Sequence, residues 1–397
     1  MDVVYLDNNA STACDLRVVE AMNRHHLEFY ANPSSSHRFG QAAHEAVDRA
    51  AGQLAALVGC DERELVFTSG GTESINLALR GVMAGAKARG QNHIVTSTVE
   101  HQAVRECLAQ LVRGGCRVTE VRVDSNGALD LDQLADSLTH ETALVTLMAA
   151  NNETGVLTDI DAVGRLVAKA GVPLHLDATQ LAGKGAMDLA QWPQVQLATL
   201  SAHKFHGPKG MGALFVRRGA RIVPQMPGLQ QGRRRGGTEN VPGIVGMGLA
   251  AEIAKAELPH TIAHCAGLRD QLAEGLARRI DVGVIHAGHA PRLCNTLSIG
   301  FPGLQAEAIV LLLSERGICI SAGSACHSGS LEPSYVLSAM GVPQAIAHGT
   351  VRLSLSRLST QSDVDAVLEV LPEVVARLGK LHGLSRAVNI LGGTRVA

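Results

Sequence analysis

The stretch Leu197-Ala-Thr-Leu-Ser-Ala-His-Lys204 decides how this chain is understood, because an apolar segment ends in a lysine just before a glycine-rich turn. We predict a buried strand over Leu197–Ser201. Burial at the end of such a strand lowers the pKa of an amine and makes it nucleophilic toward an aldehyde. Lys204 is therefore a candidate to form a Schiff base, although a lone lysine in such a position is more often a surface residue or half of a structural ion pair.

A second apolar strand ends in an acid. Asp177 closes the strand in Pro173-Leu-His-Leu-Asp-Ala-Thr-Gln180. A carboxylate at such a point can keep a pyridine nitrogen protonated, and the protonated ring is what makes pyridoxal phosphate an electron sink. Asp177 and Lys204 are thus candidates to bind such a cofactor, and a structural ion pair is the alternative.

The connection Ser69-Gly-Gly-Thr72 is a candidate phosphate site. It lies between an expected strand, Leu65–Thr68, and an expected helix that includes Glu73–Arg80. Glycines let the backbone approach an anion, Thr72 adds a hydroxyl, and the N-terminus of the helix attracts negative charge. Similar turns also serve as plain helix caps, and this one matches neither the P-loop nor the dinucleotide pattern.

Polar residues follow two further strands. The segment Ala143–Ala149 leads into Asn151-Asn-Glu-Thr-Gly155, and His93–Thr98 leads into Glu100-His101. Ligands of open parallel sheets collect at the carboxyl ends of the strands, so we expect these residues to converge with Lys204. His101 can stack on a flat ring and move protons, or it can simply belong to the start of a helix.

Cys326 has unusual surroundings for a cysteine. It lies in Ser321-Ala-Gly-Ser-Ala-Cys-His-Ser-Gly-Ser330, where few side chains are large enough to bury it. An accessible cysteine beside His327 can act as a nucleophile if its thiolate is favoured. None of the eight cysteines has zinc-ligand or C-x-x-C spacing, so no intrinsic metal site is expected.

Taken together, these blocks resemble the cysteine desulfurases of the NifS/IscS type, which are class-V aminotransferases and fold-type I pyridoxal phosphate enzymes. The resemblance runs from Tyr5 to about Leu378, and the segment after Cys326 is similar to the longer-loop group of the family. Further matching blocks are Tyr5-Leu-Asp-Asn-Asn-Ala10, Asn32-Pro-Ser-Ser35, His37-Arg-Phe-Gly40, Arg235-Gly-Gly-Thr-Glu239, Ser330-Leu-Glu-Pro-Ser-Tyr335 and Val351-Arg-Leu-Ser354.

The expected fold class is α/β. Strands alternate with helical stretches up to about Leu258, as in a parallel sheet covered on both faces. The resemblance implies a large pyridoxal phosphate-binding domain over residues 16–258, with a mostly parallel seven-stranded sheet. A smaller α+β domain over residues 1–15 and 259–378 would carry the catalytic cysteine loop, and residues 379–397 would form a C-terminal tail. A helix is expected to end before Glu257-Leu-Pro-His260, a plausible domain boundary.

The resemblance also implies a role for each catalytic residue. Lys204 would bind the cofactor covalently, and Cys326 would carry the sulfur as a persulfide. Asp177 would pair with the pyridine nitrogen, His101 would stack on the ring, and Gln180 would bond the ring hydroxyl.

The remaining implied ligands hold phosphate and substrate. The guanidinium of Arg352 suits the carboxylate of L-cysteine because it can bond it with two parallel N–H groups. The phosphate ligands would be Gly71, Thr72, Ser201 and His203, with Thr238 reaching in from a second subunit. The substrate ligands would be Asn32, Asn152 and Arg352, and Asn152 would also lie near the ring.

The predicted function is that of a homodimeric cysteine desulfurase. It would convert L-cysteine to L-alanine and pass the sulfur from Cys326 to an acceptor, expected to be an iron–sulfur scaffold protein; Cys326 could itself ligate a transient iron–sulfur cluster during transfer. The alternatives are a selenocysteine lyase and a desulfurase dedicated to tRNA or DNA thiolation. An aminotransferase needs no such cysteine, and a cofactor-free interaction protein needs neither Lys204 nor Asp177.

Composition excludes several other classes. The 397 residues contain 35 basic and 37 acidic side chains, so general nucleic-acid binding and attraction to membrane surfaces are not expected. No apolar run approaches the roughly 18 residues that a membrane span requires. Cysteines without a disulfide-like pattern in a long chain predict a cytoplasmic enzyme.

Overall fold

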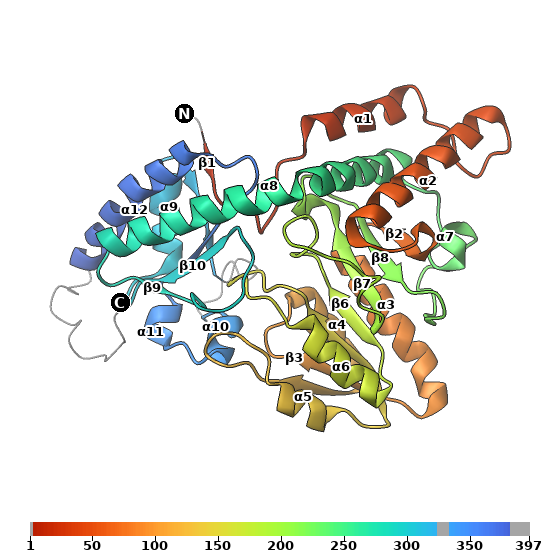
Figure 1. The fold of residues 1–397 in the computed structure, drawn as a ribbon, viewed down its shortest axis with the longest axis horizontal. Helices are drawn as coiled ribbons and strands as arrows, with labels where there is room; N and C mark the ends of the chain where they lie inside the picture. Colours follow the sequence, from red (N-terminus) through yellow and green to blue (C-terminus); the bar gives the residue numbers. More distant parts are fainter. Residues whose placement is uncertain (1–2, 324–332, 382–397) are drawn as a thin grey trace.

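The computed structural model describes residues 3–323 and 333–381 (Figure 1). Cys326 lies outside these residues, as does most of the expected C-terminal tail. A seven-stranded sheet forms the centre of the larger part. Only β8 runs against its neighbours, so the predicted mostly parallel sheet is confirmed. The strand order is β2 (Leu65–Thr68), β8 (Gly212–Val216), β7 (Val195–Ser201), β6 (Leu174–Asp177), β5 (Thr142–Met148), β3 (His93–Ser97) and β4 (Arg117–Val121).

The central strands are buried along their whole length, which explains their nearly continuous apolar sequences. One face of the sheet packs against α3 (Gly71–Ala86) and α4 (Gln102–Arg113). The other face packs against more helices, so the sheet has helices on both sides. These helices are α1 (Leu16–Leu27), α2 (Arg38–Val58), α5 (Leu131–Ser137), α6 (Ile160–Ala170) and the first half of α8 (Val241–Arg279).

A second, smaller core is built around an antiparallel four-stranded sheet. Its strands, in spatial order, are β12 (Ser321–Ala322), β13 (Thr350–Ser354), β10 (Thr296–Gly300) and β9 (Val284–Ile285). The helices of this part are α9 (Ala306–Ser314), α10 (Tyr335–Ala339), α11 (Gln344–Ala347), α12 (Gln361–Leu381) and the second half of α8.

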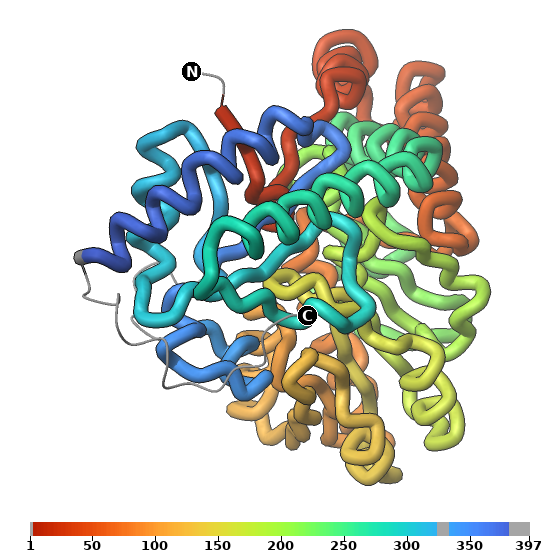
Figure 2. Tube along the Cα trace, turned by 60° about the vertical axis from the view of Figure 1, so that its left-hand side comes forward, coloured from red at the N-terminus to blue at the C-terminus, as the bar shows by residue number. Residues whose placement is uncertain are grey.

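The N-terminal residues join this smaller part. β1 (Val4–Tyr5) pairs in parallel with β11 (Ile318–Cys319), and Asp7 forms a bridge to Ser354 at the end of β13. Figure 2 shows the red N-terminal strand next to the blue C-terminal segments. The residues that follow β1 are thereby carried to the junction of the two sheets.

The expected end of a helix before Glu257-Leu-Pro-His260 is wrong. α8 continues through Pro259 for 39 residues and connects the two parts (Figure 1). A proline inside a helix removes one hydrogen bond and crowds the carbonyl of the residue four positions earlier. Here both Pro259 and Lys255, four residues earlier, are exposed, so water can solvate the freed carbonyl. α8 packs against α2 before Pro259 and against α12 after it, and this packing stabilises the continuous helix. The domain limits given above stay a prediction.

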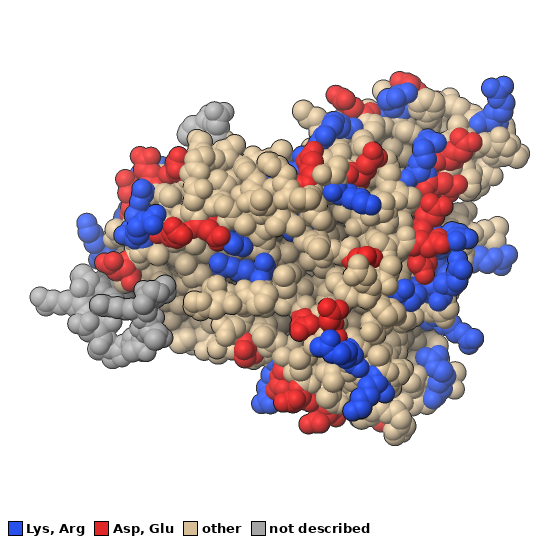
Figure 3. All heavy atoms as spheres, in the orientation of Figure 1, with Lys and Arg blue, Asp and Glu red and all other residues tan. Residues whose placement is uncertain are grey.

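The surface carries no large field of one sign on the face shown in Figure 3, where acidic and basic side chains are interspersed. Among the helices that the structure describes, none is both long and apolar enough to cross a membrane.

Candidate active site

Lys204 lies directly after β7, at the end of a short 3-10 helix, η3 (Ala202–Lys204). Its Nζ donates hydrogen bonds to the backbone oxygens of Asn9 at 2.7 Å and Ala10 at 2.8 Å. The amine is therefore held between the carboxyl end of the large sheet and the N-terminal segment.

Asp177 and His101 lie near this amine. Asp177 ends β6, the strand beside β7, and its buried carboxylate accepts a hydrogen bond from the backbone N–H of Thr179 at 3.0 Å. His101 caps α4, with Nδ1 accepting from the backbone N–H of Ala103 at 3.1 Å. Burial lowers the pKa of His101, while the charge of Asp177 raises it and that of Lys204 lowers it. The ring is thus close enough to both charges to be affected by them, as their positions at the strand ends predict.

Asn9 connects the residues of the site, and the sequence analysis assigned it no role. Its backbone oxygen accepts from Lys204 and from Gln180 Nε2, the latter at 2.9 Å. Its Nδ2 donates to the backbone oxygen of Asn152 at 3.2 Å and to Thr296 Oγ1 at 2.8 Å. Asn9 is 1% exposed. The signal in the sequence was that Asn9 belongs to the matching block Tyr5-Leu-Asp-Asn-Asn-Ala10.

Arg352 reaches the same place from β13 of the smaller sheet. Its Nη1 donates to the backbone oxygen of Asn152 at 2.9 Å, and its Nη2 donates to Asp7 Oδ1 at 2.7 Å. Two buried polar atoms here have no partner among the described residues: Arg352 Nε and Asn152 Oδ1. Since buried polar groups are normally bonded, these atoms indicate a place where a polar ligand can be received.

Three of the predicted phosphate ligands, Gly71, Thr72 and Ser201, lie at or near the start of α3. No side chain among the described residues caps this helix, and Gly70 before it has a φ of +155°. A Cβ on Gly71 would lie 3.6 Å from the Cβ of Ser201 and 3.4 Å from Thr179 Oγ1. The N-terminus of α3 therefore faces the ends of β6 and β7, which is the arrangement that an anion requires.

Two predicted phosphate ligands, Thr72 and His203, differ in how far they are buried. Thr72 is exposed in the first turn of α3. His203 Nδ1 lies 3.1 Å from Ser11 Oγ, and burial, together with the charge of Lys204, lowers the pKa of this histidine to about 4. His203 is therefore neutral at physiological pH and can offer a hydrogen bond but no charge.

The structure does not bring Asn32 and Thr238 to this group. Asn32 lies in the exposed connection between α1 and α2, where its side chain accepts from the backbone N–H of Ser34 at 2.9 Å. Thr238 is exposed in the segment before α8. Their contacts with substrate and with a second subunit's phosphate, like the role of Cys326, stay predictions.

Glu100 is a buried acid that the sequence analysis quoted without giving it a role. It is fully buried, and its Oε1 accepts from Ser97 Oγ at 2.6 Å and from the backbone N–H of Met148 at 3.1 Å. Burial, with some contribution from the charge of Asp177, raises the pKa of Glu100 to about 8. Glu100 is therefore mostly protonated at neutral pH.

Glu153 lies near residues on both sides of the segment that contains Cys326. Its Oε2 accepts from Ser334 Oγ at 2.5 Å, and a Cβ on Gly323 would lie 3.5 Å from the same oxygen. Burial raises the pKa of Glu153 to about 7. Glu153, the residue after Asn152, thus bonds Ser334 after the cysteine segment and lies close to Gly323 before it.

Comparisons with known proteins identify the family of this chain. The family described as "Aminotransferase class-V" matches residues 4–367. A cysteine desulfurase of Nostoc sp. is 48% identical over 382 residues, which cover 96% of this chain and 95% of that protein. The chain belongs to the cysteine desulfurases of the class-V aminotransferase family.

Solved structures of relatives have the same fold. A NifS-like protein, 38% identical, matches with a TM-score of 0.88 over 95% of this chain and 100% of its own. SspA in complex with cysteine, 31% identical, matches with a TM-score of 0.78 over 90% of this chain and 99% of its own. The predicted family, fold class and cysteine desulfurase function are confirmed.

Proposed function

We propose that this desulfurase uses pyridoxal phosphate bound at Lys204 to remove sulfur from L-cysteine, giving L-alanine and a persulfide on Cys326. The observation that supports this most is that Lys204, Asp177 and His101 follow the carboxyl ends of β7, β6 and β3 at the same edge of the large sheet. The solved SspA–cysteine complex supports L-cysteine as the substrate.

The residues of the site fit pyridoxal phosphate. The uncapped start of α3, with Gly70 and Gly71 next to Ser201, suits a phosphate group. Asp177 suits a positively charged ring nitrogen, and the neutral His101 suits a flat ring. The unpartnered Asn152 Oδ1 suits a polar group of the ring or the substrate. Lys204 supplies the amine that an aldehyde needs.

When bound, pyridoxal phosphate supplies an electron sink next to the substrate Cα. Asp177 stabilises the positive charge on which that sink depends. Lys204, whose Nζ lies among the oxygens of Asn9 and Ala10, moves the proton at the substrate Cα. Arg352 holds the substrate carboxylate, so that Cα faces Lys204.

Sulfur transfer requires no external oxidant or reductant. The Cys326 thiolate forms a bond to the substrate sulfur while the bond between that sulfur and Cβ breaks. The electron pair of the broken bond stays with Cβ, which takes up a proton as L-alanine forms. Cys326 then carries the sulfur as a persulfide that a second thiol or a cluster scaffold can accept.

The assembly and the destination of the sulfur are part of the proposal. We infer a cytoplasmic homodimer in which the exposed Thr238 completes the phosphate site of the second subunit. The acceptor is an iron–sulfur scaffold protein. Selenocysteine cleavage is the competing function, since it needs the same residues except Cys326.

Replacement of Lys204 tests the cofactor site. Lys204→Ala should abolish alanine formation and the visible absorbance of the bound cofactor, whereas Lys169→Ala, an exposed lysine on α6, should change neither. Borohydride treatment of the wild-type protein should attach the cofactor to the peptide that contains Lys204. Attachment to any other lysine would refute the assignment.

A further inference from the structure

Lys184 is a buried lysine to which the proposed mechanism gives no role. It is 8% exposed and lies in the turns that follow β6, four residues after Gln180. Its Nζ donates to Gln180 Oε1 at 2.5 Å and to Asn9 Oδ1 at 3.3 Å. Lysine is rarely buried unless its ammonium is bonded, so its place next to the site needs an explanation.

These contacts allow only one orientation of the Gln180 amide. Burial lowers the pKa of Lys184 to about 7, and in its protonated form the amine has only donors, so the oxygen of the amide faces it. The backbone oxygen of Asn9 has only lone pairs, so the nitrogen of the amide faces Asn9, at 2.9 Å. One N–H of Gln180 is used by Asn9, and the other N–H remains as a donor. The reversed amide would lose both bonds, whereas without Lys184 it would lose only the bond to Asn9.

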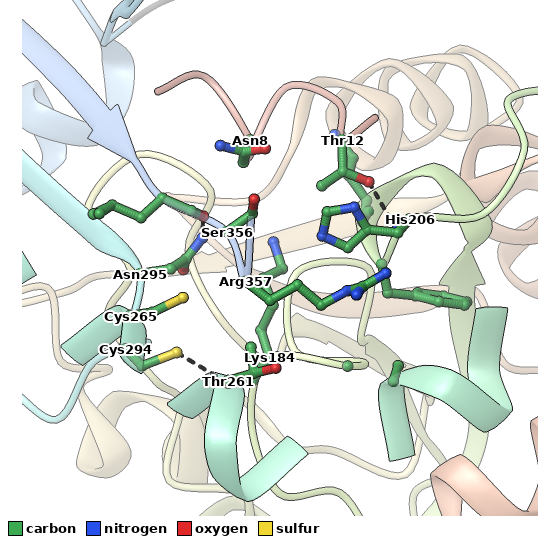
Figure 4. A pocket seen from close by; sticks show the side chains of 15 residues that line it. Asn8, Thr12, Lys184, His206, Thr261, Cys265, Cys294, Asn295, Ser356 and Arg357 are labelled. Atoms are coloured by element: carbon green, nitrogen blue, oxygen red, sulfur yellow. Dashed lines mark hydrogen bonds between the residues drawn. The ribbon is translucent and has the colours of Figure 1, made fainter. Parts of the chain in front are cut away.

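Lys184 also belongs to the surroundings of Lys204. Both lysines line one small pocket, together with Asn8, Cys294 and Asn295 (Figure 4). The backbone oxygen of Asn9 accepts from Lys204 and from Gln180, while the side-chain oxygen of the same residue accepts from Lys184. Asn9 therefore joins both lysines and Gln180 in one hydrogen-bonded group.

We propose that Lys184 is a positioning residue that makes Gln180 a hydrogen-bond donor toward the cofactor. The inference rests on the proposed function, in which Gln180 bonds the ring hydroxyl oxygen of pyridoxal phosphate. That oxygen carries negative charge when the ring is bound, so an N–H stabilises it and an amide oxygen repels it. Lys184 acts through Gln180 and touches neither ring nor substrate.

The experiment is a double-mutant cycle on cofactor affinity. Full-length holoenzyme is diluted serially, and the dissociation constant is obtained from the loss of its visible absorbance. Lys184→Met keeps the length of the side chain but has no donor, and it should weaken cofactor binding about ten-fold, as expected for loss of one charge-assisted hydrogen bond. In a Gln180→Leu background, the same change should cost less than about two-fold. If Lys184→Met lowered the cofactor affinity equally in the wild-type and Gln180→Leu backgrounds, the proposal would be overturned.

Lys184→Gln is the matched rescue. Its amide can still donate to Gln180 Oε1, so it should bind the cofactor within about three-fold of wild type, since it keeps that hydrogen bond. An affinity about ten-fold weaker than that of wild type would contradict the proposal, and this comparison with wild type remains decisive if Lys184→Met does not fold. Borohydride trapping of the cofactor on Lys204 of the wild-type protein separates the proposed function from the proposed role of Lys184. Absent trapping refutes the proposed function, whereas normal trapping with an unaltered affinity in Lys184→Met refutes only the role of Lys184.

Discussion

Arg352 and Asp7, 345 residues apart in the chain, form a hydrogen-bonded ion pair of 2.7 Å at the junction of the two sheets. The arginine side chain is almost completely buried, and the backbone oxygen of Asn152 accepts its Nη1. Asp7 offsets the cost of burying this guanidinium and restricts its rotation. Arg352 is therefore oriented before any substrate arrives.

Replacement of Arg352 should affect substrate binding rather than cofactor binding. Arg352→Ala should raise KM for L-cysteine by roughly ten- to hundred-fold, because a hydrogen bond to a charged group contributes about 1.5–3 kcal/mol. The visible absorbance of the cofactor should remain. Arg352→Lys keeps the charge but lacks the paired N–H groups, so its KM should lie between those of wild type and Arg352→Ala. An unchanged KM in Arg352→Ala would place the carboxylate elsewhere.

Glu100 should make the protein less stable as the pH rises. An unfolded glutamate has a pKa of about 4.3, whereas burial raises that of Glu100 to about 8. Between these values the native state holds a proton that the unfolded state has lost, so the free energy of unfolding falls with increasing pH. Glu100→Gln cannot titrate. Its Tm relative to wild type should therefore be higher near pH 8 than below about pH 5.

The control for Glu100 is Glu106→Gln, an exposed position on α4. Thermal unfolding of this variant should follow wild type across the same pH range. A Tm difference between Glu100→Gln and wild type that stays constant with pH would show that Glu100 is ionised in the native protein, contrary to our interpretation.

Thr238 should complete the phosphate site of the partner subunit. Lys204→Ala and Thr238→Ala chains are each expected to have little activity alone. In a mixed dimer, one site carries both changes and the other carries neither, so about half of the wild-type activity per dimer should return if each site works independently. Verified mixed dimers that remain as inactive as their parents would show that Thr238 does not cross between subunits.

Residues at the ends of the large sheet were predictable from sequence because each follows its own strand. Lys204, Asp177 and His101 are placed by β7, β6 and the start of α4, so local strand and helix signals were enough. The orientation of the side-chain amide of Gln180, four residues before Lys184, could not be predicted from such local signals.

The residues that were missed depend on contacts between distant parts of the chain. Asn9 reaches the site because β1 pairs with β11 and Asp7 bridges to Ser354, and no local pattern reports such pairings. Glu100 has an ordinary sequence context, and its perturbed pKa arises only from burial. Pro259 led to the wrong prediction of a helix end, since tertiary packing along α8 outweighs the cost of one proline.

The most direct test of the account is to locate the sulfur after a single turnover. Wild-type protein is mixed with L-cysteine, and peptides are analysed by mass spectrometry without reductant. We predict the mass of one added sulfur atom on the peptide that contains Cys326, reversible by dithiothreitol, while Cys326→Ser keeps the cofactor and releases almost no alanine. A hydroxyl is too weakly acidic to replace a thiolate at this pH. Sulfur found only on another cysteine such as Cys319, or full alanine production from L-cysteine by Cys326→Ser, would contradict the proposed mechanism.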